Sequence, residues 1–140
     1  MQLRMYFGHP VNAYDTELEQ RLVRKIAEAF PMWEIENPNQ PKHQERYDQY
    51  KIATGNGMTY FTEEVLPSCR GGIFLPFRDG KWGAGVFKEA QYYSDRNFPI
   101  WSINAEGFVG QLVLANIHPL SIEETRARIR TSDGKIIPYD

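Results

Sequence analysis

GGIFLPFRDGKWGAGVFKEAQYYSDRNFPIWSIN, residues 71–104, is the stretch from which the fold of this chain can be predicted. Two short apolar runs, at 73–77 and 99–103, lie on either side of a glycine-rich loop and a segment with helical periodicity. This order predicts a strand, a loop, a helix and a second strand parallel to the first. The other segments are interpreted around this unit.

The expected helix of this unit carries an apolar stripe formed by Val86, Phe87, Ala90 and Tyr93. Glu89 lies on the flank of the stripe, one turn from Val86 and Tyr93. In an open parallel sheet, ligands bind where strands end and the next helices begin. Glu89, in the first turns of a helix behind a glycine-rich loop, is therefore a candidate for chemistry. The alternative interpretation is an ordinary surface glutamate, as most glutamates are.

The rest of the chain alternates between strand and helix patterns. Thr16 and Glu19 form a capping-box pair, and Ser121 and Glu124 form another, so each pair marks a helix start. The segment ENPNQPKH at 36–43 is expected to be irregular because two prolines lie close together among asparagines. The expected elements are strands at 3–7 and 32–35, helices at 16–30, 44–51, 59–68 and 121–130, an edge strand at 136–139, and an unassigned apolar run at 112–117.

Alternating strands and helices predict an α/β fold. We expect three layers, with a mostly parallel, twisted sheet covered by helices on both faces, of the Rossmann-like or flavodoxin-like kind. With 140 residues the chain is expected to form a single domain over 1–140.

Composition narrows the classes of function. The net charge of −2 argues against a nucleic-acid polymer as partner, because phosphate binding needs a basic surface. The single cysteine, Cys69, excludes an intramolecular disulfide framework and a zinc site built on cysteine pairs, and the histidines make no recognisable metal set. No apolar run is long enough to cross a bilayer, so we expect a cytoplasmic protein that does not bind membranes.

Four blocks of sequence resemble the nucleoside 2-deoxyribosyltransferases and their relatives, which include nucleotide N-glycosidases. MYFGHP at 5–10 resembles the first loop of that family, and TEEVLPSCRGGIFLPF at 62–77 its middle helix and strand. GAGVFKEA at 83–90 is similar to its glutamate motif, and FPIWSI at 98–103 to its closing strand. The resemblance covers about the first three quarters of the chain.

The resemblance implies roles for individual residues. Glu89 matches the nucleophilic glutamate of the family, and Gly85 matches the motif glycine. Tyr6 and Gly8 match positions that line the pocket for the sugar or base. Glu63, or Thr62 one place earlier, falls near the pocket acid of the middle helix. Together these matches imply a site that binds the sugar and the base.

Two departures from the family pattern concern the proton donor. Gly83 stands where the transferases have the motif aspartate, and Val86 stands where they have threonine or serine. Asp79 is close enough in sequence to replace that aspartate as a catalytic acid. Loss of the aspartate also favours an alternative, a non-catalytic nucleotide-binding protein of the same fold.

The implied activity is nucleoside or nucleotide N-glycosyl hydrolysis or deoxyribosyl transfer. A carboxylate stabilises the positive charge that develops at the sugar C1 and can attack C1 to form a covalent intermediate. Water then gives hydrolysis, and a second base gives transfer. No cofactor or metal is implied, the ligand is a small nucleoside or nucleotide, and the family habit and high aromatic content favour a homo-oligomer.

Other residues of the unit have both a functional and a structural interpretation. Gly83 and Gly85 could leave amides open to a phosphate at the helix N-terminus, or they could serve a flexible turn. Trp82 could stack on a base or lie at a subunit contact. His9 could touch a ligand phosphate or only cap a loop.

Overall fold

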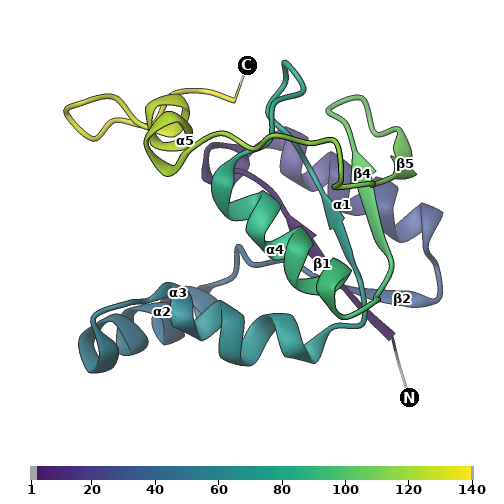
Figure 1. Ribbon diagram of the computed structural model, residues 1–140, viewed down its shortest axis with the longest axis horizontal. Coiled ribbons are helices and arrows are strands. Elements are labelled where there is room, and N and C mark those ends of the chain that lie inside the picture. Colours follow the sequence, from purple (N-terminus) through teal and green to yellow (C-terminus); the bar gives the residue numbers. More distant parts are fainter. Residues whose placement is uncertain (1–2, 140) are drawn as a thin grey trace.

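The computed structural model describes residues 3–139, and a five-stranded sheet forms the centre of this part of the chain (Figure 1). The strands are β1 (Leu3–Gly8), β2 (Trp33–Glu36), β3 (Gly72–Phe74), β4 (Ile100–Ile103) and β5 (Val109–Gln111). Their order is β2-β1-β3-β4-β5, with β1 to β4 parallel and β5 antiparallel to β4. This confirms the predicted α/β fold, and the order is that of flavodoxin-like sheets apart from the direction of β5.

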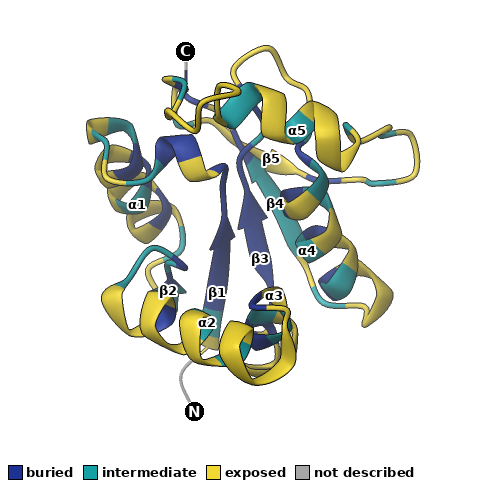
Figure 2. Cartoon of the chain, turned by 90° about the vertical axis from the view of Figure 1, so that its left-hand side faces the viewer, coloured by how far each residue is buried: buried dark blue, intermediate teal, exposed yellow. Residues whose placement is uncertain are grey.

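Helices cover both faces of the sheet. They are α1 (Glu17–Ala29), α2 (Pro41–Thr54), α3 (Met58–Tyr60), α4 (Ala84–Asp95) and α5 (Ile122–Ile129), with short turns η1 (Val11–Ala13), η2 (Phe61–Val65) and η3 (Leu66–Ser68). Figure 2 shows α1 on one side of the sheet and α4 on the other. Among residues 3–139, no helix is both long enough and apolar enough to span a membrane.

The two-residue period of the strands divides the core into two layers. Met5 and Phe7 of β1 pack toward α1, whereas Tyr6 between them packs toward α4. In the same way, Ile73 belongs to the α1 layer and Phe74 to the α4 layer. The α1 layer is completed by Leu22, Ile26, Leu75 and Ile103, and the α4 layer by Val86, Ala90 and Tyr93. The sheet is therefore buried on both sides, as the sequence predicts.

The segment at 36–43 corrects the sequence interpretation, because α2 begins at Pro41 and not after it. Proline is well tolerated in the first turn of a helix, since its missing N–H would have no partner there. The helix expected at 44–51 is thus present but longer, and it ends at Gly55, whose φ of 78° closes the C-terminus.

Further along the chain, the expectations for 59–68 and 136–139 were wrong in detail, and the structure settles the run at 112–117 that the sequence left unassigned. The helix expected at 59–68 is divided into α3, the π-helical turn η2 and the 3-10 turn η3. The run at 112–117 forms neither helix nor strand, and β5 lies just before it. The expected edge strand at 136–139 is reduced to one bridge between Arg130 and Ile136, because Tyr139 instead turns inward and donates a hydrogen bond to the Pro76 carbonyl at 2.5 Å.

At Gly72, the backbone of β3 packs closely against aromatic rings of the α4 layer. A Cβ at this position would lie 2.6 Å from Cε2 of Phe74 and 3.2 Å from Cδ2 of Tyr93. We expect Gly72→Ala to lower the free energy of unfolding by about 1–3 kcal/mol in chemical denaturation, because both rings are fully buried. Gly110→Ala in β5 is the control, since its nearest atom would be Ser102 Oγ at 3.5 Å. Equal stability of the two variants would contradict this account of the packing.

Candidate functional site

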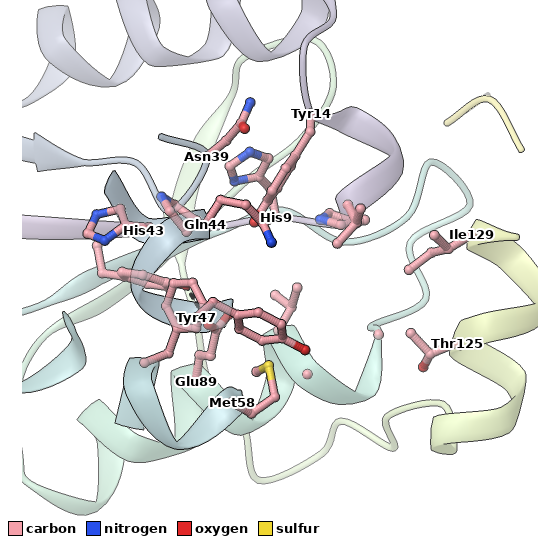
Figure 3. A pocket seen from close by; sticks show the side chains of 18 of the residues that line it. His9, Tyr14, Asn39, His43, Gln44, Tyr47, Met58, Glu89, Thr125 and Ile129 are labelled. Atoms are coloured by element: carbon pink, nitrogen blue, oxygen red, sulfur yellow. Dashed lines mark hydrogen bonds between the residues drawn. The ribbon is translucent and has the colours of Figure 1, made fainter. Parts of the chain in front are cut away.

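A pocket of about 420 Å³ opens at the carboxyl-terminal ends of the parallel strands. Its walls come from the loop after β1, from α2 and α3, from the first turns of α4, and from α5 (Figure 3). Binding sites in open α/β sheets occur at this edge, and the volume lies within the range of roughly 300–1,000 Å³ found for small-molecule sites.

Glu89 and Tyr6 form the polar floor of this pocket. The Tyr6 hydroxyl donates to Oε2 of Glu89 at 2.5 Å, which joins β1 to α4. Tyr6 is buried, whereas Glu89 keeps part of its surface open to the pocket. Burial raises the pKa of Glu89 to about 7, and the Tyr6 hydrogen bond opposes this shift. Burial and the nearby Glu89 charge raise the pKa of Tyr6 well above its ordinary value, so Tyr6 stays a donor.

Gly8 is required by the close approach of two side chains. A Cβ on Gly8 would lie 2.5 Å from Cδ1 of Phe74 and 3.1 Å from Oε1 of Glu89. The Phe74 ring therefore occupies the space that side chains at Gly8 and Gly72 would need. Gly8, one of the sequence-predicted pocket positions, is the residue that allows Glu89 to approach β1.

His9 is buried beside the pocket, and both of its ring nitrogens are engaged. Nδ1 is 3.0 Å from the Phe7 carbonyl oxygen, and Nε2 is 2.7 Å from Oε2 of Glu19. Burial alone would raise the pKa of Glu19, but hydrogen bonds from His9 and Asn39 outweigh it and lower that pKa. Both ring nitrogens of His9 therefore lie within hydrogen-bond distance of protein oxygens, and neither is left for a ligand.

A second buried pair, His43 with Glu36, was missed by the sequence interpretation. His43 Nε2 lies 2.6 Å from Oε1 of Glu36, and Nδ1 lies 2.6 Å from the Tyr60 hydroxyl. These contacts join β2, α2 and α3. Asn39, before α2, also donates its amide to Glu19 at 2.9 Å. The only sequence signal was the histidine itself, because its partners are set by the tertiary fold.

The structure does not bring Asp79 to the pocket. Asp79 is exposed, and Arg128 of α5 donates to its Oδ2 at 2.7 Å. The hydrogen bond from Arg128 is the main reason that the pKa of Asp79 is lowered. An ionised carboxylate in this pair has no proton to give, and Asp79 does not line the pocket. The prediction of Asp79 as the catalytic acid therefore gains no support from its position.

Of the remaining sequence-predicted site residues, some line the pocket and others lie outside it. Gly83 and Gly85 line the pocket. Glu63 is exposed on η2 and Trp82 packs against the α4 layer, and neither lines the pocket. The pocket thus collects Tyr6, His9, Gly83, Gly85 and Glu89 from the sequence-predicted set.

Tyr14 and Tyr47 also line the pocket, and sequence reasoning did not single them out. Tyr14 follows the first strand by only a few residues, so its place in the loop at the strand end was an available signal. Tyr47 lies on α2, in the part of the chain expected to be an excursion, and nothing local pointed to it.

No family model matches this chain, and no match was found among curated proteins or solved structures. Within residues 3–139, no group of three or more His, Cys, Asp or Glu side chains could hold a metal ion. The resemblance to deoxyribosyltransferases therefore depends on the sequence motifs alone.

Glu89 should make the stability of the protein depend on pH. Its pKa in the folded state, about 7, lies above the ordinary 4.5, so stability is lost as pH rises from about 4.5 through 7. We expect Glu89→Gln, which keeps an acceptor for Tyr6, to be more stable than wild type by roughly 1–3 kcal/mol at pH 8 and equally stable at pH 4.

Chemical denaturation at both pH values provides the measurement. Glu63→Gln is the matched control, because this carboxylate is exposed and lies outside the pocket. A gain for Glu89→Gln that is the same at pH 4 and pH 8 would contradict the assignment of a buried, destabilising charge.

Proposed function

We propose that this protein is an N-glycosyl hydrolase or deoxyribosyltransferase that acts on a nucleoside or nucleotide, with Glu89 as the nucleophile. The observation that carries the proposal is the position of the Glu89 carboxylate. It lies in the wall of a pocket of small-ligand size, at the edge of the sheet where α/β proteins bind ligands. The motif resemblance supplies the reaction class.

The two oxygens of Glu89 are not equivalent, and this supports a nucleophilic role. Oε2 accepts the Tyr6 hydrogen bond, whereas Oε1 has no hydrogen-bond partner among residues 3–139 and is not sealed from the pocket. Tyr6 thus fixes the carboxylate by one oxygen and leaves the other available to attack C1 of a sugar. A positioned carboxylate is what formation of a glycosyl–enzyme ester requires.

The proposed reaction has two steps. Oε1 of Glu89 forms a bond to C1 as the bond from C1 to the base nitrogen breaks, and the electron pair leaves with the base. Water, or the nitrogen of a second base, then attacks C1 and releases Glu89 as a carboxylate. The first acceptor gives hydrolysis and the second gives transfer.

A second candidate function, a nucleotide-binding protein without turnover, is favoured by one observation. Among the described residues, Glu89 is the only carboxylate side chain that lines the pocket, because Asp79 and Glu63 lie elsewhere. A rise in melting temperature with a nucleotide, without release of base, would select this candidate.

Base release is the direct test of the proposed enzyme. Purine and pyrimidine deoxynucleosides and their 5′-monophosphates are incubated with the protein, and free base is separated and quantified. We expect release from at least one of them and a loss of roughly a thousandfold or more in Glu89→Ala, because the covalent route is removed. Glu63→Ala is the control and should retain activity. Absence of release from every compound would reject the proposed enzyme.

The pH profile tests the charge state of Glu89. Because the nucleophile must be ionised, kcat/KM should increase with pH and level off above about 7. The Tyr6 hydrogen bond lowers the pKa of Glu89, so Tyr6→Phe should move this limb to higher pH. Tyr93→Phe is the control, since it removes another buried hydroxyl, bonded to the Leu66 carbonyl, and keeps the Tyr6 bond. A profile that falls above pH 7 would instead assign Glu89 as an acid.

A further inference from the structure

Two tyrosine hydroxyls in the pocket are uncommitted. Tyr14 and Tyr47 line the pocket, and neither hydroxyl has a hydrogen-bond partner among residues 3–139. Neither oxygen is among the sealed polar atoms that lack a partner, so both are accessible, and both residues line the pocket. An open donor in a pocket wall is available to a ligand.

Apart from the Arg130 guanidinium, which has no partner among residues 3–139, the other polar side chains in the walls are largely committed to the protein. His9 and His43 use both ring nitrogens, and the Asn39 amide donates to Asp15 and Glu19. The Thr125 hydroxyl donates to the Ser121 carbonyl and accepts from the Ala84 N–H. The free hydroxyl donors that remain in the walls are those of Tyr14 and Tyr47.

Tyr14 and Tyr47 are held in place by different contacts. The Tyr14 N–H donates to the Val11 carbonyl at 3.0 Å, and its ring packs against the His9 ring with centroids 4.8 Å apart. It projects into the pocket from the loop between η1 and α1 (Figure 3). Tyr47 instead extends from α2, where its ring contacts Phe61.

Tyr14 also lies within electrostatic reach of Glu89. Burial is the main cause that raises the pKa of Tyr14 far above its ordinary value, and the charges of Glu89 and Glu19 add to it. Tyr14 therefore keeps its proton over the whole range in which Glu89 ionises. It is a hydrogen-bond donor near the nucleophile and not a source of protons.

We propose that the Tyr14 hydroxyl donates the hydrogen bond that stabilises the departing base, in place of the proton transfer that the sequence interpretation expected from Asp79. This inference rests on the proposed function. As the bond from C1 to the base nitrogen breaks, the electron pair moves onto the base, and the hydroxyl of Tyr14 donates to an acceptor atom of the anion that develops. Tyr14 keeps its proton, and the released base takes one from water. A donor aimed at developing charge in a desolvated site is an effective form of catalysis.

The test compares substrates that need this donor with substrates that do not. 2′-Deoxyguanosine releases an anionic base, whereas its N7-methyl derivative already carries a positive charge and releases a neutral base. We expect Tyr14→Phe to lower kcat with 2′-deoxyguanosine by about 100-fold and to leave kcat with the N7-methyl compound nearly unchanged. For a pyrimidine-specific enzyme, 2′-deoxyuridine and 5-fluoro-2′-deoxyuridine are the pair, and the fluorinated compound should show the smaller loss.

Tyr47→Phe is the matched control, because it removes the other free hydroxyl in the walls of the pocket. Each variant is compared with itself on two substrates, so any fraction of unfolded protein cancels from the ratio. Equal losses with both substrates in Tyr14→Phe, or the selective loss in Tyr47→Phe instead, would overturn the Tyr14 assignment and leave the proposed function intact. No base release by the wild-type protein from any of the four compounds or from their 5′-monophosphates would overturn both.

Discussion

The hydrogen bond from Tyr6 to Glu89 is the interaction on which the geometry of the pocket depends. It joins β1 to α4 and orients the Glu89 carboxylate, whose charged form is disfavoured by burial. Room for it exists because Gly8 and Gly72 have no side chains and Phe74 fills their place. The packing of the Phe74 ring and the position of the Glu89 carboxylate therefore both depend on Gly8.

The walls around this floor are fixed by buried pairs of opposite polarity. His9 with Glu19 ties the end of β1 to the start of α1, and His43 with Glu36 ties α2 to β2. A buried charge is tolerable when it is paired and hydrogen-bonded, and such pairs define a specific arrangement more than they add stability. Because these histidines and glutamates are hydrogen-bonded to one another, they are not available to a ligand. A ligand in the pocket must therefore bind to the few polar side chains that remain without a partner.

Local patterns predicted most of the fold. Helical spacing predicted the apolar stripe of α4, in which Val86, Ala90 and Tyr93 are buried. The predicted start of α5 is also confirmed, since Ser121 and Glu124 form both hydrogen bonds of a capping box. In α1 only one of the two capping-box hydrogen bonds forms. The Thr16 hydroxyl accepts from the Glu19 N–H, whereas the Glu19 side chain pairs with His9. A competing partner distant in sequence explains the difference.

The sequence by itself determined the alternating α/β architecture and placed Glu89 on the flank of an apolar stripe near a strand end, because both follow from short-range periodicity. The tertiary structure alone decided that Asp79 is paired with Arg128, 49 residues away, and that Tyr14 is left with a free hydroxyl facing the pocket. Hydrogen bonds between distant segments form only when the chain is folded, so no local pattern encodes which polar groups are used and which remain free.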